Sequence, residues 1–299
     1  MIKDGGVTLL GTGLMGTAMA GRLLAEGWPL VVWNRHAEKT LALQEQGARC
    51  LPLAASVAAA PVLLCTLSDA AALTACLDAL PAEAVQDKDL VQMSTIAPEQ
   101  SRLLAQRVQL AGGRYLEAPV LGSTPEAGSG RLLVLTGGPA ALQERLLPLL
   151  SCLGQVRHIG AVGQAAALKL ALNQLIAGLT ASFSLSLGLV REEGIRVEDF
   201  MEILRASALY APTFDKKLSR YLADDYGHPN FPERHLLKDM RLFVDTTAGL
   251  PLDSRLPALW VTLLEELLAE AGDADYAVLY RALHRRPGGG GEEGVPSAS

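Results

Sequence analysis

The fold is decided by residues 7–16 of this 299-residue chain, which read VTLLGTGLMG. The first four, Val7–Leu10, predict a short buried strand. The pattern GxGxxG follows directly and precedes a helical stretch, which is the setting in which such glycines bind a dinucleotide. The first glycine permits a tight turn, the second lets the backbone approach the pyrophosphate, and the third allows close packing of helix on strand, while the N-terminus of the helix faces the phosphates. The predicted cofactor segment is therefore Gly11, Thr12, Gly13, Leu14, Met15 and Gly16.

The residues after the second predicted strand, Leu30–Trp33, indicate which dinucleotide is bound. An NAD-specific protein usually places Asp or Glu there to bind the ribose 2′-hydroxyl. This chain has Asn34 and Arg35 instead. An arginine can pair bidentately with a 2′-phosphate, and an asparagine can donate a hydrogen bond, so we predict NADP(H) as the cofactor. The alternative is that Arg35 is a solvated surface side chain.

The rest of the first half alternates strand-like runs with helical patterns, which predicts a mostly parallel sheet wrapped by helices. We expect seven or eight strands, and the remaining candidates are residues 62–66, 89–93, 114–117, 132–136 and 156–159. From residue 164 to residue 211 there is no proline, and Ala, Leu and Ser dominate, which is typical of helices. A helix from Gln164 to about Glu193 would be about 45 Å long.

These patterns predict an α/β chain of two domains. A Rossmann-type, doubly wound, mostly parallel domain comprises residues 1–162, and an all-helical domain comprises residues 163–286. The segment 287–299 is rich in Gly, Pro, Ser and Glu and is predicted to be disordered.

Composition narrows the classes of partner and site. Hydrophobic residues make up 49% of the chain and charged residues 19%, as in a globular protein. The net charge is −6 and there is no basic run, so nucleic acid is not an expected partner. The four cysteines lack CxxC or CxxH spacing, so neither a metal site nor a disulfide framework is predicted. Cys65 lies in an apolar run and is interpreted as a buried thiol.

Location and assembly follow from the same features. The N-terminus lacks the long apolar region and cleavage site of a signal peptide, so we expect a cytoplasmic location. Residues 165–190 are apolar enough to suggest a membrane span, but Lys169, Asn173 and several hydroxyl side chains interrupt them, so we predict a buried helix and no membrane partner. Such an Ala- and Leu-rich helix needs cover on several sides, which favours a homodimer.

Five segments, taken in chain order, resemble the β-hydroxyacid dehydrogenase family, whose members include hydroxyisobutyrate dehydrogenases and glyoxylate and succinic semialdehyde reductases. Residues 11–20 resemble its opening signature, and residues 93–98, MSTIAP, are similar to its nicotinamide-proximal Ser-Thr segment. Residues 117–123, EAPVLGS, are similar to its substrate-carboxylate loop, and residues 163–173 to its catalytic helix. Lys238-Asp239 resembles its late Lys-Asp pair. The resemblance spans most of the chain.

The catalytic residues implied by this resemblance are Lys169 and Asn173. They are four residues apart and so share one helix face, which must be wet or filled by a ligand. Burial beside a positively charged nicotinamide would lower the pKa of the lysine toward the range useful for proton transfer. For an isolated lysine, the first interpretation would be a side chain that snorkels to the surface. The resemblance implies instead that Lys169 exchanges a proton with the oxygen of a small aldehyde or keto acid during hydride transfer, while Asn173 orients that oxygen.

The resemblance also implies binding residues. Gly122, Ser123 and Thr95 would bind the substrate carboxylate, although an ordinary β-turn is the alternative at residues 122–123. The cofactor contacts predicted beyond the glycine loop are Asn34, Arg35, Leu67, Ser68, Ser94, Thr95 and Lys238. Asp239 would stabilise the catalytic region, although a solvated Lys-Asp pair is the alternative.

One departure from the family pattern affects the substrate loop. Many members carry Ser where this chain has Leu121, and many carry Gly where it has Ser123. The glyoxylate and succinic semialdehyde reductase branch offers Ser at the latter position, and NADP preference favours reduction. We therefore expect an NADP(H)-dependent reductase of a small aldehyde acid.

Three other functions are compatible with parts of the sequence. Imine reductases share the opening motif but typically place Asp or Tyr at the position of Lys169. 6-Phosphogluconate dehydrogenase is much longer, and this chain has no evident cationic cluster for a sugar phosphate. A catalytically idle NADP-binding protein is the third, because a fold does not determine a function.

Overall fold

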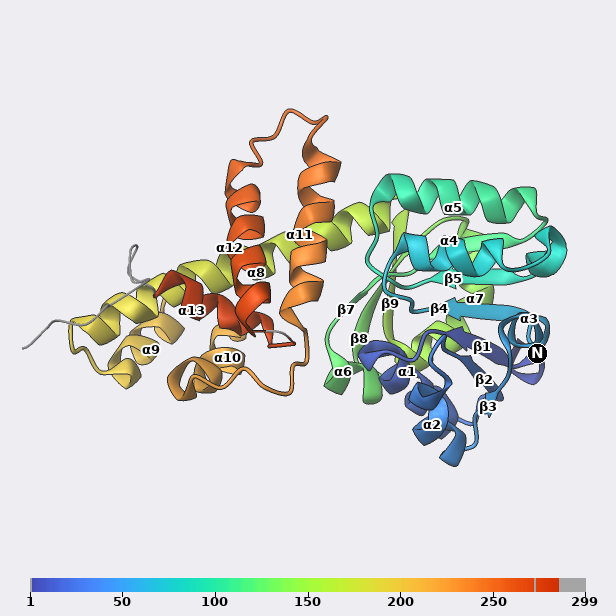
Figure 1. Ribbon diagram of the computed structural model, residues 1–299, viewed down its shortest axis with the longest axis horizontal. Coiled ribbons are helices and arrows are strands. Elements are labelled where there is room, and N and C mark those ends of the chain that lie inside the picture. Colours follow the sequence, from blue (N-terminus) through green and yellow to red (C-terminus); the bar gives the residue numbers. More distant parts are fainter. Residues whose placement is uncertain (1, 272, 285–299) are drawn as a thin grey trace, which may run out of the picture. The chain divides into compact units, whose positions relative to one another are not determined.

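The computed structural model describes residues 2–271 and 273–284; the segment 287–299, predicted to be disordered, lies outside them. The chain forms two compact units. The first comprises the residues up to Leu172 together with Leu242–Leu252, and the second comprises Asn173–Arg241 and the residues from Asp253 on. The first unit holds the sheet, and the second is helical (Figure 1).

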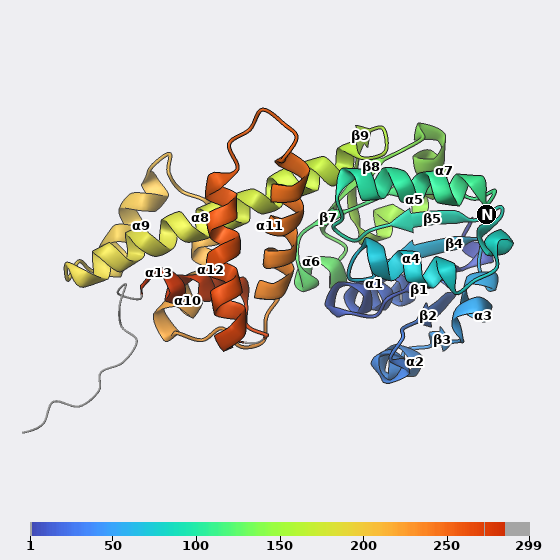
Figure 2. The ribbon, with the colours of Figure 1, turned by 45° about the horizontal axis from the view of Figure 1, so that its top comes forward.

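The first unit is built on one sheet, which has nine strands among the described residues (Figures 1 and 2). They are β1 (Val7–Leu10), β2 (Leu30–Trp33), β3 (Arg49–Cys50), β4 (Val62–Cys65), β5 (Asp89–Gln92), β6 (Arg114–Glu117), β7 (Val120–Leu121), β8 (Leu132–Gly137) and β9 (Gly154–Gly160). Their order is β3-β2-β1-β4-β5-β6-β8-β7, with β9 paired to β8. Pairs are parallel, except that β8 is antiparallel to β6 and β7.

Helices cover both faces of this sheet because alternate residues of its strands point to opposite sides. The helices of this unit are α1 (Leu14–Ala25), α2 (Leu41–Glu45), α3 (Leu53–Ala58), α4 (Ala70–Asp78), α5 (Pro98–Leu110), α6 (Thr124–Gly128) and α7 (Ala140–Leu153), with the 3-10 helices η1 (Ile2–Gly5), η2 (Ala37–Thr40) and η3 (Ala82–Val85). Leu9 and Leu64 join a core with α1 and α7, whereas Leu63 and Cys65 join a second core with α4 and α5.

The predicted fold class is confirmed, and all seven strand candidates form strands. The predicted number of strands, seven or eight, is wrong. The two unpredicted strands, β3 and β7, have two residues each. Such strands are too short to show a period in the sequence, and they form because a neighbouring strand supplies the partners for hydrogen bonds.

The second unit is a set of helices around an aromatic core. The Phe183 and Phe214 rings stack with centroids 4.6 Å apart, and Tyr221 and Trp260 are buried in the same core. Its elements are the greater part of α8 (Gln164–Glu192), α9 (Val197–Ala206), α10 (Pro212–Ala223), the greater part of α11 (Glu233–Thr247), α12 (Arg255–Ala271), the 3-10 helix η4 (Tyr276–Val278) and α13 (Leu279–Leu283).

Helix α8 agrees with the helix predicted from the sequence, and it begins at the expected residue. By length and composition it is the one described helix that could cross a membrane, a test that the core helix of a soluble protein also passes. Its residues Ala177, Phe183 and Leu187 are buried. The two units divide within α8, after Leu172, whereas the domain boundary predicted between residues 162 and 163 precedes the helix. That boundary stays a prediction.

Candidate active site

The glycine loop between β1 and α1 has the backbone that its spacing predicts. Gly11 has a φ of +104°, and a Cβ atom there would lie 2.8 Å from the carbonyl oxygen of Thr66. A Cβ atom on Gly16 would overlap the carbonyl oxygen of Gly11. Around Gly13 there is open space, since no atom lies within 4 Å of its ideal Cβ position. The loop therefore turns tightly, packs closely at Gly16 and leaves its surface at Gly13 accessible to a ligand.

The end of β2 is tied to this loop. The Gly11 backbone N–H donates to the Trp33 carbonyl at 2.8 Å. The Asn34 amide donates from Nδ2 to Thr12 Oγ1 at 2.9 Å and accepts the His36 N–H at 2.9 Å. One of the two N–H bonds of Asn34 therefore positions the glycine loop. Arg35 is exposed at the end of the strand, where a 2′-phosphate is predicted to bind.

The ends of β4 and β5 bring further predicted cofactor residues together. The Ser94 hydroxyl donates to the Leu67 carbonyl at 2.5 Å, and the Ser94 N–H donates to Gln92 Oε1 at 2.8 Å. Ser68 donates to Asp69, which also accepts the Ala72 N–H and so caps α4. Because β1, β4 and β5 are adjacent and parallel, their carboxyl ends meet at one edge of the sheet, where open α/β sheets bind ligands.

In the predicted substrate loop, the binding groups of Ser123 are already hydrogen-bonded to a carboxylate of the chain. Gly122 has a φ of +127°, and Ser123 is the N-cap of α6. The Ser123 N–H and hydroxyl both donate to Glu126 Oε2, at 2.9 and 2.6 Å. These are the groups that were predicted to bind the substrate carboxylate. Glu126 was missed from the sequence, although Ser-x-x-Glu before a helix is a known capping pattern.

A second missed residue is Glu117, the last residue of β6, which is 2% exposed. Its side chain contacts the first turn of α8. Its Oε1 accepts the Ala165 N–H at 2.8 Å and the Ala166 N–H at 3.4 Å, and its Oε2 accepts the Ser101 hydroxyl at 2.5 Å. Its partners are up to 49 residues away in the chain, so no local pattern revealed this contact.

Lys169 follows this capped start by about one helical turn. It is 8% exposed and therefore buried. The alternative of a lysine that reaches bulk solvent does not fit this burial. Its catalytic role stays a prediction, and burial is a setting in which the pKa of a lysine can be shifted for proton transfer.

In the second unit Asn173 is held by Asp239. Both side chains are buried, and the Asn173 Nδ2 donates to Asp239 Oδ2 at 2.5 Å. Because a carboxylate only accepts hydrogen bonds, it turns the amide nitrogen toward itself, and within the described part of the chain the buried Asn173 Oδ1 has no partner. Lys238 Nζ lies 3.1 Å from Asp239 Oδ1. The late Lys-Asp pair is therefore half-buried and orients an amide.

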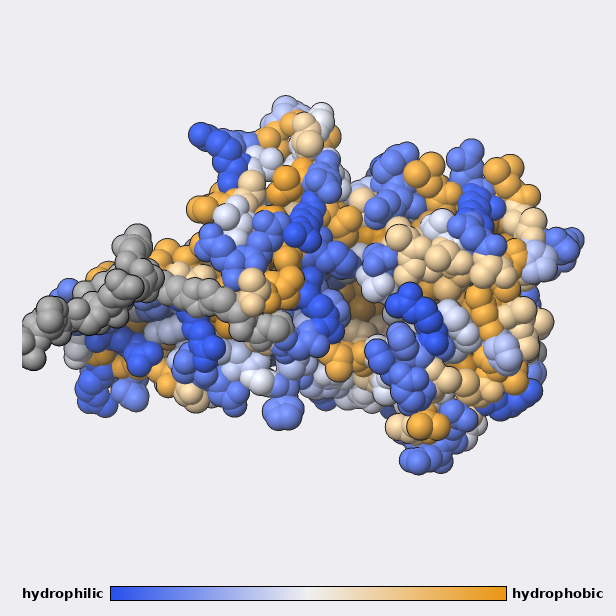
Figure 3. All heavy atoms as spheres, viewed as in Figure 1, coloured by the Kyte–Doolittle hydropathy of each residue, from blue (hydrophilic) through white to orange (hydrophobic). Residues whose placement is uncertain are grey.

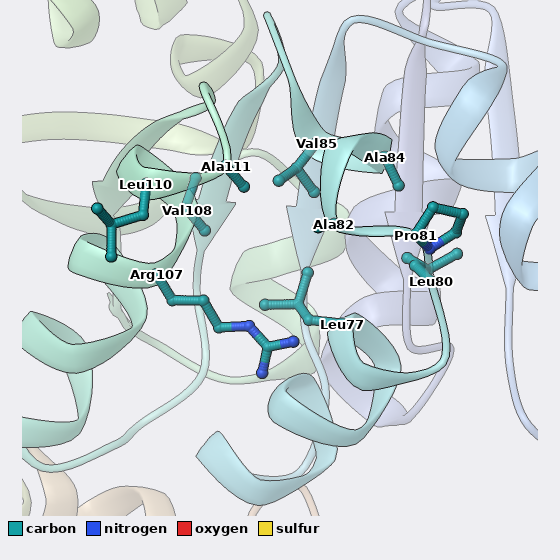
Figure 4. Close-up of a pocket in the computed structure, with 10 residues that line it drawn as sticks. All are labelled: Leu77, Leu80, Pro81, Ala82, Ala84, Val85, Arg107, Val108, Leu110 and Ala111. Carbon is teal, nitrogen blue, oxygen red and sulfur yellow. The ribbon is translucent and has the colours of Figure 1, made fainter.

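Two pockets lie elsewhere. One, of about 230 Å³, is lined by apolar residues and by Arg107, from the end of α4, from η3 and from the end of α5 (Figure 4). Apolar residues also gather on the surface over α4 (Figure 3). These helix ends lie at the edge of the sheet opposite the glycine loop. A second pocket, of about 330 Å³, includes Arg114 and Arg145, which pair with the buried Asp89. Neither pocket contains a predicted site residue.

The cysteines and the acidic and histidine side chains form no further site among the residues that the structure describes. The four thiols are free. Cys65 is fully buried, as predicted, and burial raises the pKa of its thiol. In the same residues, no three His, Cys, Asp or Glu side chains gather where they could hold a metal ion.

Comparison with protein-family models gives two matches that together cover most of the chain. The NAD binding domain of 6-phosphogluconate dehydrogenase matches residues 6–163. The model described as NAD-binding of NADP-dependent 3-hydroxyisobutyrate dehydrogenase matches residues 163–283.

Individual proteins agree with these models. Glyoxylate/succinic semialdehyde reductase 1 from Arabidopsis thaliana is 34% identical over 241 residues, which cover 79% of this chain and 83% of that protein. The structure of Mycobacterium tuberculosis 3-hydroxyisobutyrate dehydrogenase with L-serine has a TM-score of 0.85 at 20% identity, over 93% of this chain and 99% of that chain, and shows the fold alone. Psf3 in complex with NADP+ and 2-OPP has a TM-score of 0.80 at 26% identity, over 93% of this chain and 99% of that chain.

Proposed function

Because the chain belongs to the β-hydroxyacid dehydrogenase family, in its 3-hydroxyisobutyrate dehydrogenase-like group, we propose that it is an NADP(H)-dependent reductase of a small aldehyde or keto acid. Glyoxylate and succinic semialdehyde are the first candidate substrates, because the Arabidopsis relative is named for them. The observation that carries the proposal is the burial of Lys169 within the apolar helix α8. A buried cation in that position has a physical reason to exchange a proton.

The cofactor residues fit a dinucleotide with a 2′-phosphate. The open space at Gly13 admits a pyrophosphate close to the backbone, and α1 carries no acidic residue in its first turn that would repel it. Arg35 is exposed and can pair with a 2′-phosphate. The structural relative Psf3 is in complex with NADP+, which also supports this choice. When bound, the nicotinamide supplies or accepts the hydride.

The chain's own residues would handle the proton and the orientation of the substrate. In the reductive direction Lys169 donates a proton to the carbonyl oxygen as negative charge develops on it. Asp239 binds the amide nitrogen of Asn173, so that the Oδ1 of Asn173 can accept a hydrogen bond from the product hydroxyl. Ser123, Gly122 and Thr95 would bind the substrate carboxylate, which requires Ser123 to exchange Glu126 for the substrate.

A substrate panel with a lysine variant tests this function. The purified protein should oxidise NADPH with glyoxylate, succinic semialdehyde or a related acid, and should not reduce uncharged analogues or cyclic imines. Lys169→Ala should lower kcat by about 100- to 10,000-fold, the usual contribution of a general acid, and leave the Kd for NADPH within about 2-fold. Reduction of cyclic imines alone would favour an imine reductase. Equal kcat in the variant would refute the role of Lys169.

We also propose that the chain forms a homodimer through the exposed apolar face of α8. Leu175, Leu185 and Leu189 are each more than half exposed on that helix, and burying them against a second copy would be favourable. Light scattering after size-exclusion chromatography should give twice the mass of the chain. A monomer at micromolar concentration would contradict this.

A further inference from the structure

Glu117 stands where three parts of the first unit meet. It ends β6, it faces Gln92 of β5 and Gly137 of β8 in the sheet, and the substrate loop follows it directly. Its carboxylate accepts hydrogen bonds from the first turn of α8 and from Ser101 near the start of α5. One buried side chain therefore connects a strand, the predicted substrate loop and the helix that carries Lys169.

The arrangement suits a carboxylate, because each of these partners donates a hydrogen bond to it. A buried anion is costly unless hydrogen bonds and positive charge surround it. The start of a 29-residue helix provides N–H groups that have no partner within the helix, together with the positive end of its dipole. The sheet keeps room for the group, because a Cβ atom on Gly137 would overlap Glu117 Oε1. Ser101 and Tyr115 complete the cluster through a hydroxyl contact of 2.9 Å.

The contact acts on the part of the helix where position matters for proton transfer. Ala165 and Lys169 are four residues apart, about 6 Å along a helix axis, so a shift of the first turn moves the lysine with it. Misplacing a catalytic group by about 1 Å can cost about 100-fold in rate. We propose that Glu117 is a positioning residue, which sets the place of Lys169 relative to the substrate loop by anchoring the start of α8. The inference rests on the proposed role of Lys169.

The test compares Glu117→Ala and Glu117→Gln with the wild-type protein. The glutamine can keep its oxygen on the Ala165 N–H and turn its amide nitrogen to Ser101, whose hydroxyl can also accept. We expect kcat to fall about 100-fold in the alanine variant and by no more than about 10-fold in the glutamine variant, with the Kd for NADPH within about 2-fold. The loss of kcat in Ser101→Ala should lie between those of the two Glu117 variants.

Two readouts separate positioning from loss of stability. Leu146→Ala, on the buried face of α7, is the matched control, since it should lower Tm without changing kcat. With NADPH deuterated at the transferred position, the isotope effect on kcat should increase in Glu117→Ala, because the chemical step becomes slower than product release, and stay unchanged in Leu146→Ala. Amide exchange in residues 164–168 should become faster in Glu117→Ala only.

The outcomes are distinguishable. If the wild-type protein is active, Lys169→Ala is inactive and Glu117→Ala keeps wild-type kcat, the positioning role is wrong and the proposed function stands. If Leu146→Ala loses as much kcat as Glu117→Ala at equal loss of Tm, the effect is one of stability, and the inference is again overturned. If Lys169→Ala is fully active, both fail. Should Glu117→Ala not fold, Ser101→Ala decides by its isotope effect, and an unchanged value there overturns the inference.

Discussion

Two helices of the first unit begin at predicted binding segments, and they meet negative charge in opposite ways. Helix α1 begins after Gly13, which makes no side-chain capping bond, and has no acidic residue in its first turn. Helix α6 begins after Ser123, whose N–H and hydroxyl are both bound to Glu126. The first helix start therefore has no internal anion, whereas the second has one, which the proposed substrate would have to displace.

The same contrast extends to two longer helices. At the start of α8 a carboxylate, Glu117, is fully hydrogen-bonded. At the start of α11 the carboxylate of Glu233 is fully buried, and neither oxygen has a hydrogen-bond partner among the described residues. An acidic side chain near a helix start can therefore have different effects. Its hydrogen-bond partners decide whether it caps the helix, competes with a ligand anion or destabilises the fold.

The largest effect should come from a side chain that disrupts the glycine loop before α1. Gly16→Ala places a Cβ atom on the Gly11 carbonyl, so we expect loss of detectable NADPH binding and a decrease of about 1–3 kcal/mol in the free energy of unfolding. Gly13→Ala, in open space, is the matched control and should leave the free energy of unfolding nearly unchanged. Fluorescence titration and chemical denaturation measure both. Tight binding by the Gly16 variant would contradict the assigned loop geometry.

The next effect concerns the choice of cofactor. Arg35→Asp should weaken NADPH binding by about 1.5–3 kcal/mol and leave NADH little affected, because the charge pair with the 2′-phosphate is replaced by repulsion. Parallel titrations with the two cofactors measure the difference. An unchanged preference would overturn the assignment of Arg35.

Glu233 predicts a dependence of stability on pH. Burial raises the pKa of this carboxyl from 4.5 to about 7 in the folded protein. Between these two values the folded state binds more protons than the unfolded state, so this group's contribution to stability decreases as pH rises from about 4.5 to about 7. Glu233→Gln should therefore be more stable than wild type at pH 8, by roughly 1–2 kcal/mol, and nearly equal at pH 5. Denaturation at the two pH values tests this, and an equal difference at both would contradict it.

The smallest effect should come from weakening the contact between Ser123 and Glu126 at the start of α6. Glu126→Gln removes a negative charge that competes with an acid substrate for Ser123, so KM for that substrate should decrease about 3- to 10-fold while kcat changes little. Loss of the charged cap should cost about 0.5–1 kcal/mol of stability. Steady-state kinetics on the best acid of the panel measure the change. An increase in KM would show that Glu126 supports substrate binding instead.

Whether a feature could be predicted from the sequence depended on how close together in the chain its residues lie. The glycine loop, seven of the strands and the whole of α8 were predicted, because each has a short-range period or spacing that follows from backbone geometry. Glu126 was equally local and was overlooked. The two-residue strands β3 and β7 were not accessible in this way, since they exist only where a neighbouring strand binds them.

The sequence alone predicted seven strands in their order along the chain, the long helix α8, the turn at the glycines and the residue types that each segment offers to a ligand. The hydrogen bonds from Glu117 to the start of α8, and from Asn173 to Asp239 66 residues away, are seen only in the folded chain. Hydrogen bonds between distant segments depend on strand register and helix packing. Those are settled by burial of the whole core, and no local pattern encodes them.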